Sequence, residues 1–268
     1  MQHYDLIHNS KLFTGTALSF FLLFLLWNTS YGDYCFSLFF PLLMLLAVSY
    51  GYIELKMAER HCIKKCYFKE KSLFSRLLSS RILVTLVYML LSLAMTVSTF
   101  VVVLDFPSWL WGYLLFHTLV SVLVFRYLNH LFTDTFQEKY QSLFAREWSI
   151  RIMALLLIAV FVYMSLNTYT PEYLTHSLKE TIMNASDTVS SHCVYIEKAL
   201  KVGKMIDSSF WWVINESTEQ MDHRVVKTSI WLAFLFYNSL ALLGINRLII
   251  QIIYLLDRGF SGRKKFMA

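Results

Sequence analysis

Charge, glycine and proline are all scarce in this sequence. Only 16% of the 268 residues are charged, whereas 57% are hydrophobic and 17% aromatic. A soluble domain is roughly one quarter charged, so this chain lacks the polar side chains that a water-facing surface requires. With 8 glycines and 3 prolines it also has few turn residues, which favours long helices over a β protein. These shortages exclude soluble globular, disordered, collagen-like and disulfide-rich classes and predict an all-α, polytopic helical membrane protein.

Catalytic and metal-binding motifs are missing as well. The sequence contains no G-x-S-x-G, H-E-x-x-H, P-loop or Rossmann glycine pattern. His61, Cys62 and Cys66 fall short of the four ligands of a zinc site. We therefore expect no enzymatic activity, no cofactor and no metal. The net charge of +6 is expected to orient the chain in a membrane rather than to bind nucleic acid directly.

Six segments are apolar enough to cross a bilayer, which takes about 20 residues. The first of them could instead be a signal peptide, but it ends in the bulky pair Leu26 and Trp27 and has no small-residue cleavage pattern, which favours an uncleaved helix. The six predicted spans are 12–27, 34–53, 82–104, 109–125, 150–166 and 227–245.

Positive charge alternates between the connections of these spans. The connectors 54–81 and 126–151 and the C-terminal tail are rich in Lys and Arg, whereas the turns 28–33 and 105–108 contain neither. The long segment 167–224 is net acidic. By the positive-inside rule, both termini and both basic connectors are cytoplasmic. The bilayer is the first partner, and the basic connectors are expected to attract anionic lipid headgroups.

Three regions follow from this topology. The sequons at Asn28, Asn184 and Asn215 and two of the four cysteines, Cys35 and Cys193, all fall on the predicted outer side. A Cys35–Cys193 disulfide and two unrelated thiols are both consistent with that position. The regions are a five-span part with two basic connectors (1–166), an exoplasmic amphipathic helical hairpin (167–226), and the sixth span with its basic tail (227–268).

The predicted hairpin begins with an amphipathic helix. Apolar residues recur at three- and four-residue steps from 174 to 203, and Asp207 is a suitable N-cap for a second helix that opens at Phe210 and continues into the sixth span. The apolar stripe either packs within the hairpin or docks a partner protein. The interface candidates are Leu178, Ile182, Val189, Ile196, Trp211 and Trp212.

A second amphipathic stretch lies on the predicted cytoplasmic side. An aromatic residue or Leu recurs every fourth position from Leu128 to Trp148, through Phe132, Phe136 and Phe144. This spacing predicts a helix lying along the inner membrane interface.

Few polar side chains are expected inside the membrane. His117 lies midway along the fourth span with Ser121 beside it, Asn238 lies midway along the sixth, and Arg247 is placed near the inner edge. No carboxylate is expected at mid-membrane, which disfavours an ion-coupled transporter. His117 and Asn238 are expected to form hydrogen bonds with neighbouring helices or, alternatively, to line a weakly polar path.

The C-terminal region has a recognisable order of residues. A glycine is followed seven residues later by glutamine, and then by a turn with Asp, Arg, Phe and Gly. These residues are Gly244, Gln251, Asp257, Arg258, Phe260, Gly262, Arg263 and Phe266. The pattern resembles the tail of a group of inner-membrane proteins of integrating conjugative elements, over about one sixth of this chain; the second glycine of those tails is Leu248 here. The resemblance implies a conjugation or type IV secretion accessory in a bacterial inner membrane.

Together these patterns predict a non-enzymatic accessory or scaffolding subunit of a larger membrane assembly, with membrane-protein partners. The alternative from another class is a channel or uniporter whose path surrounds His117 and Asn238.

Overall fold

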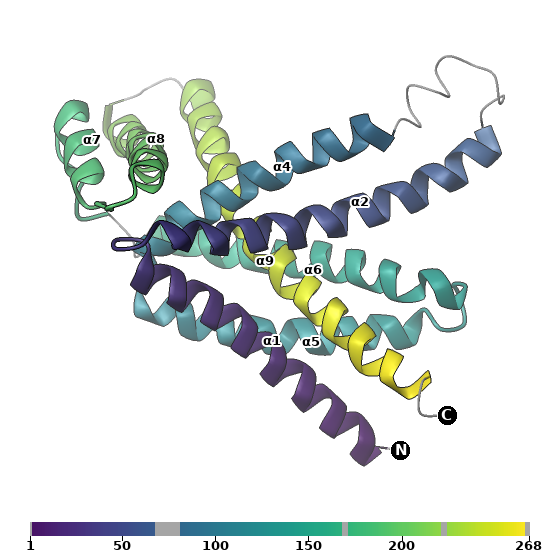
Figure 1. Ribbon diagram of the computed structural model, residues 1–268. Helices are drawn as coiled ribbons and strands as arrows, with labels where there is room; N and C mark the ends of the chain where they lie inside the picture. The colour runs from purple at the N-terminus through teal and green to yellow at the C-terminus, as the bar shows by residue number, and fades with distance from the viewer. Residues whose placement is uncertain (1, 68–80, 168–170, 221–223, 266–268) are drawn as a thin grey trace.

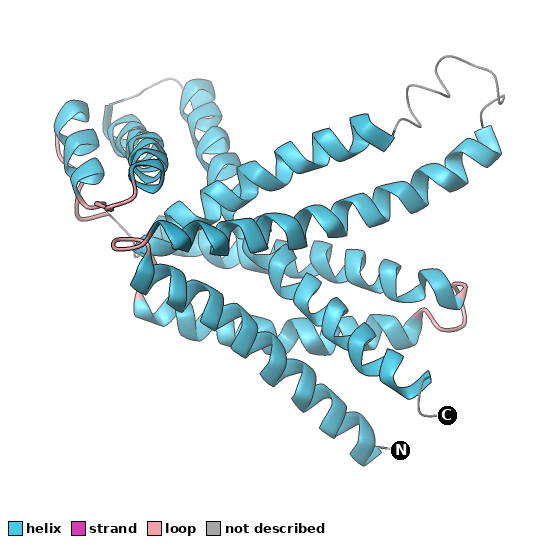
Figure 2. Cartoon of the chain, viewed as in Figure 1, coloured by secondary structure: helices cyan, strands magenta, loops and turns pink. Residues whose placement is uncertain are grey.

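The structure is a computed structural model that describes residues 2–67, 81–167, 171–220 and 224–265. Within these ranges the chain is helical apart from short turns, and no strand occurs (Figure 2). The elements are α1 (Gln2–Ser30), η1 (Cys35–Leu38), α2 (Phe39–Tyr67), α4 (Arg81–Val102), η2 (Val103–Asp105), α5 (Ser108–Leu131), α6 (Glu138–Asn167), α7 (Leu178–Asp187), α8 (Val194–Gln220) and α9 (Arg224–Lys265).

Long apolar helices confirm an integral, multi-pass membrane protein of the all-α class. Five segments of the described chain have the length and hydropathy of a membrane span. They are Ile7–Ser30, Cys35–Arg60, Ile82–Asp105, Ser108–Leu131 and Leu232–Phe260. The predicted fifth span, 150–166, is helical and lies within α6, which packs against α5 and α9 but is not one of these five segments.

The two ends of the bundle differ in what they carry (Figure 1). The helix α1 begins and the helix α9 ends at one end, together with the turn between α5 and α6; we call this the terminal end. The short helix α7, the helix α8 and the turn between α1 and α2 lie at the opposite end, which we call the hairpin end. The helix α9 crosses the bundle obliquely and contacts α1, α2, α4, α5, α6 and α8.

The predicted continuous helix along the inner interface is wrong. The helix α5 ends at Leu131, and α6 begins only at Glu138. The side chain of Gln141 donates to the carbonyl of Asn129 at 2.5 Å, which satisfies one of the exposed carbonyls at the end of α5. The regular aromatic spacing serves this turn instead, because the rings of Phe136 and Phe144 stack across it with centroids 4.4 Å apart.

The helical hairpin is present, but its turn lies earlier than predicted. The chain leaves α7 at Asp187 and enters α8 at Val194, so the predicted single helix over 174–203 is interrupted. The expected break at Asp207 does not occur, since α8 continues through it. The hydroxyls of Ser208 and Ser209 donate back to the carbonyl of Met205, as serine does inside a helix, rather than capping a new one.

Candidate functional site

A buried cluster of charges joins α2, α6 and α9. Its centre is Arg146 of α6, whose side chain is completely buried. One terminal nitrogen of Arg146 donates to Glu54 Oε2 at 2.8 Å, and the other donates to the carbonyl of Gly51 at 2.8 Å and lies 3.2 Å from Glu147 Oε1. The ring of Tyr254 lies 4.7 Å from the guanidinium carbon. A single cation thus contacts all three helices.

The cluster continues along α9. Arg247 donates to Glu147 Oε1 at 3.0 Å, and its guanidinium carbon lies 3.3 Å from the centre of the Tyr52 ring, a cation–π contact. The hydroxyl of Tyr254 donates to Glu54 Oε1 at 3.1 Å. Glu54 therefore bonds to α6 and α9, and Glu147 bonds to α9 and to Arg146 of its own helix. We call Glu54, Arg146, Glu147 and Arg247 the charge network.

Local sequence explains why these groups converge. Arg247, Gln251, Tyr254 and Arg258 are spaced by four, three and four residues, which places them on one face of α9. Gln251 accepts a hydrogen bond from Arg146 at 3.3 Å. It can approach α2 closely because residue 51 is glycine: a Cβ there would lie 2.6 Å from Gln251 Oε1.

Glu54 and Arg247 lie within segments that have the length and hydropathy of a membrane span, whereas Arg146 and Glu147 lie in α6, outside those segments. Arg247 is 13 residues from the end of the segment Leu232–Phe260, or about 20 Å along the helix axis. The predicted sixth span ends at Ile245, which places Arg247 near its inner edge, whereas the apolar segment of α9 continues to Phe260. Glu147, which lies outside the predicted spans, accepts from both arginines.

His117 forms a buried hydrogen bond with Asn246, the neighbour of Arg247 in the sequence. The imidazole Nε2 of His117 lies 3.1 Å from Asn246 Oδ1, and the amide of Asn246 donates to the carbonyl of Ile150 at 2.8 Å. His117 therefore bonds to a neighbouring helix, as expected. Ser121 donates to the carbonyl of His117 within α5, and Asn238 donates to the carbonyl of Phe234 within α9. These last two bonds do not connect helices.

A smaller ionic cluster lies nearer the terminal end. Asp257 of α9 is 3.0 Å from the Nε2 of His8 in α1 and 3.6 Å from a terminal nitrogen of Arg126 in α5. Arg126 also donates to Asn9 at 3.1 Å. Arg126, which was predicted to lie in a basic cytoplasmic connector, thus helps to hold α1, α5 and α9 together.

A disulfide ties the hairpin to the bundle. Cys35 and Cys193 are bonded, with their Cα atoms 5.0 Å apart, which confirms one of the two interpretations of these cysteines. Next to it the backbone amide of His192 donates to the carbonyl of Gly32 at 2.8 Å, and Ser191 donates to the carbonyl of Tyr31. These bonds explain why the hairpin turns at 188–193.

Polar contacts on α8 form a second attachment of the hairpin. Lys204 is almost completely buried and forms an ion pair with Asp105, at the end of η2. One turn further, the buried carboxylate of Asp207 accepts a hydrogen bond from the hydroxyl of Tyr173 at 3.0 Å. Burial raises the pKa of Asp207 to about 6, although the hydrogen bond from Tyr173 opposes this shift.

Half of the six predicted interface residues are covered within the chain. Val189 and Ile196 are buried in the core beneath the hairpin, and Trp211 packs edge-on against Phe234 of α9 with ring centroids 4.8 Å apart. These three side chains form no open docking surface, so the packed interpretation of the stripe applies to them. The remaining three are partly accessible: Leu178, Ile182 and Trp212.

Sequence reasoning missed Glu54, Arg146, Glu147 and Gln251 as members of one site. The available signal was the spacing of polar residues in α9 beyond Ile245. Within the described part of the chain, no three His, Cys, Asp or Glu residues are placed to hold a metal ion. Comparison with protein-family models, with curated proteins and with solved structures finds no match to this chain.

Proposed function

We propose that this protein is a non-enzymatic scaffolding or accessory subunit of a larger membrane assembly. The observation that carries the proposal is the pairing within the charge network: its two arginines and two glutamates are paired with each other across three helices, and Arg258 also lies 3.3 Å from Glu54. Removing one member of a buried pair is costly, because its partner is left charged and unpaired in a poorly polarisable surrounding. Such a network fixes the helices relative to one another, which suits a rigid support.

The orientation is part of the same proposal. The hairpin end faces the exoplasmic side, since disulfides such as Cys35–Cys193 persist in oxidising compartments. The terminal end, with its basic connectors, then faces the cytoplasm, in keeping with the positive-inside rule. A bacterial inner membrane and a role in conjugation or type IV secretion are suggested by the resemblance of the C-terminal region.

Purification in a mild detergent tests the scaffolding role. A C-terminally tagged wild-type chain is expected to recover partner proteins in a fixed ratio, measured by native mass spectrometry. The matched variant is Arg146→Leu, which disrupts the network, with Arg151→Leu as the control because Arg151 is exposed on the same helix. Recovery that falls only in Arg146→Leu supports the proposal. A wild-type chain that purifies alone, with no partner at fixed ratio, contradicts it.

A second candidate is a channel or uniporter. It is favoured by the buried bond from His117 to Asn246, whose neighbour in the sequence, Arg247, pairs with Glu147. Its test is proton flux into liposomes containing the wild type, His117→Ala, or Ser121→Ala as a control whose hydroxyl bonds only within α5. Flux that requires His117 but not Ser121 would establish the channel and contradict the scaffold.

A further inference from the structure

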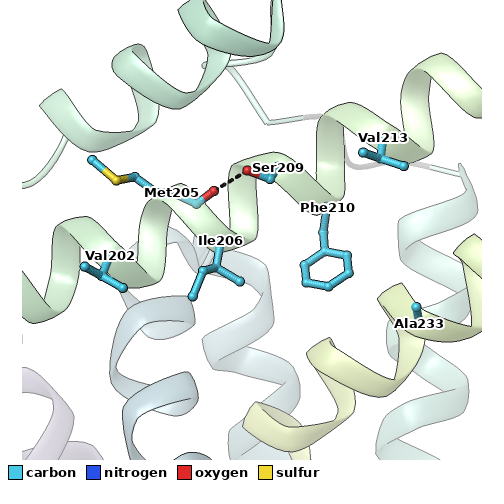
Figure 3. Close-up of a pocket in the computed structure, with 7 residues that line it drawn as sticks. All are labelled: Val202, Met205, Ile206, Ser209, Phe210, Val213 and Ala233. Carbon is cyan, nitrogen blue, oxygen red and sulfur yellow. Dashed lines mark hydrogen bonds between the residues drawn. The ribbon is translucent and has the colours of Figure 1, made fainter.

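An apolar groove runs between α8 and the beginning of the membrane segment of α9 (Figure 3). Its volume is about 540 Å³, and it is lined by residues of α8 between Val202 and Val213 together with Ala233 of α9. Ser209 is the one polar residue in this lining, and its hydroxyl donates to the carbonyl of Met205 at 2.6 Å. The groove therefore presents hydrocarbon to whatever occupies it.

The groove lies beside the ends of two apolar segments. Figure 1 shows α7 and α8 lying across the direction of the spans rather than along it. Lys204 of α8, next to the groove, pairs with Asp105, the last residue of the apolar segment Ile82–Asp105. Ala233 is the second residue of the segment Leu232–Phe260. Two spans thus begin or end beside the groove.

The side of α8 next to the groove exposes apolar side chains. Val202, Met205 and Ile206 have 55%, 40% and 43% of their surfaces exposed, whereas Lys198, one turn before Val202, is exposed and charged. An apolar patch of this kind is unfavourable in water, at about 25 cal/mol for each Å².

The same apolar surface continues onto α9. Leu232 and Phe236, on either side of Ala233, are 61% and 70% exposed on a helix that spans the membrane. Their environment in a bilayer is lipid. The groove opens beside these residues, so that lipid reaches it without crossing a polar surface.

We propose that the groove holds an acyl chain of a phospholipid from the leaflet at the hairpin end, and that α8 lies in the membrane interface. Amphipathic helices bind in this way, with the apolar face buried among the upper acyl carbons. The volume falls within the range of about 300–1,000 Å³ that is common for small-ligand sites. The proposal does not depend on the scaffolding role, because it concerns only the contact of α8 with lipid.

Spin-label accessibility tests what covers the groove. In a chain carrying Cys62→Ser and Cys66→Ser, the Cys35–Cys193 disulfide remains and a label is placed at Ile206→Cys, reconstituted in phospholipid nanodiscs. The controls are Leu123→Cys, exposed on the span α5, and Lys198→Cys, exposed on the first half of α8.

We expect the label at residue 206 to collide readily with oxygen and rarely with a polar nickel complex, as at residue 123. Frequent collision with nickel, as at residue 198, would show a water-filled groove and overturn the proposal. Low accessibility to both reagents would show that a second copy or a partner protein covers the groove, and would overturn it as well.

Native mass spectrometry distinguishes a held chain from bulk lipid. Ile206→Trp fills the groove, whereas Leu123→Trp adds the same volume to an open lipid-facing surface. The first variant is expected to retain one phospholipid fewer than the wild type after detergent extraction, and the second the same number. Equal retention by all three proteins would contradict a bound acyl chain.

Discussion

Arg247 of α9 and Glu147 of α6 are separated by 100 residues in the chain, yet the buried arginine donates to the buried carboxylate at 3.0 Å. Glu147 also accepts from Arg146, its neighbour in sequence. Because one carboxylate serves two cations from two helices, neither arginine is left as an isolated buried charge. This arrangement makes the helix packing specific and leads to the following predictions.

Replacing Arg146 with leucine should destabilise the protein strongly. Glu54 and Glu147 would each lose an arginine partner. Breaking a buried ion pair costs about 3–5 kcal/mol. Thermal unfolding in detergent, followed by circular dichroism, is expected to show a large decrease in melting temperature. Arg151→Leu is the control, since Arg151 is exposed and contacts only the face of Trp148 among the contacts described for it. Equal melting temperatures for the two variants would contradict the role assigned to Arg146.

Removing the disulfide should loosen the hairpin more than the bundle. Cys35 and Cys193 are 158 residues apart, and cross-links that close long loops stabilise by about 2–5 kcal/mol. In Cys193→Ser, amide hydrogen exchange is expected to accelerate in α7 and α8, with little change in α5. Cys62→Ser should leave exchange as in the wild type. Uniform acceleration across all helices would show that the disulfide stabilises the whole bundle instead.

The hairpin should lose stability as pH rises from about 4 to about 6. Asp207 has a pKa of about 6 in the folded chain because of burial, against 3.8 in the unfolded chain, so the folded state holds a proton that the unfolded state has released. The free energy of unfolding therefore falls over this interval, by ~3 kcal/mol for a shift of about two units, and is constant above it.

The variant Asp207→Asn isolates this effect. Its amide oxygen still accepts from Tyr173 but does not titrate, so the wild type is expected to be less stable than the variant at pH 7 and to approach it at pH 4. Urea unfolding at several pH values measures the difference. A difference that does not change with pH would exclude Asp207 as the titrating group.

A side chain at position 244 should separate α4 from α9. A Cβ on Gly244 would lie 2.6 Å from Thr99 Oγ1 and 3.2 Å from the carbonyl oxygen of Met95, and a backbone atom cannot move aside at low cost. Gly244→Ala is therefore expected to lower the melting temperature. Gly112→Ala is the matched control, because its Cβ would meet open space and alanine favours a helix by up to about 1 kcal/mol. Similar effects of both substitutions would contradict close packing at Gly244.

The sequence predicted the helices well because membrane insertion depends on local properties. The length and hydropathy of a helix, and the turn before Ser108, can be predicted from neighbouring residues alone. The structure has these apolar helices and begins α5 at Ser108. The two cysteines on one predicted side also allowed the disulfide to be named as one of two outcomes. These features need no knowledge of which helices touch.

The charge network could not be predicted in the same way. Arg146 and Glu147 fall within the basic connector predicted over 126–151, so the sequence alone indicates a cytoplasmic position for them. They become buried only because α6 begins at Glu138 and packs against α9, with the side chain of Arg146 reaching Glu54 and Gly51 of α2. The turn of the hairpin was misplaced for a similar reason: it is determined by the bonds of Cys193 and His192 to the turn between α1 and α2.

The central claim is that Glu147 and Arg247 act as one structural unit that holds α6 to α9. A double-mutant cycle of Glu147→Gln and Arg247→Gln, with unfolding free energies measured in the same detergent, tests it most directly. Residues in one ionic network couple by about 0.5–3 kcal/mol, so we predict that the double variant is less destabilised than the sum of the two single variants by an amount in that range. Strictly additive losses would contradict the claim.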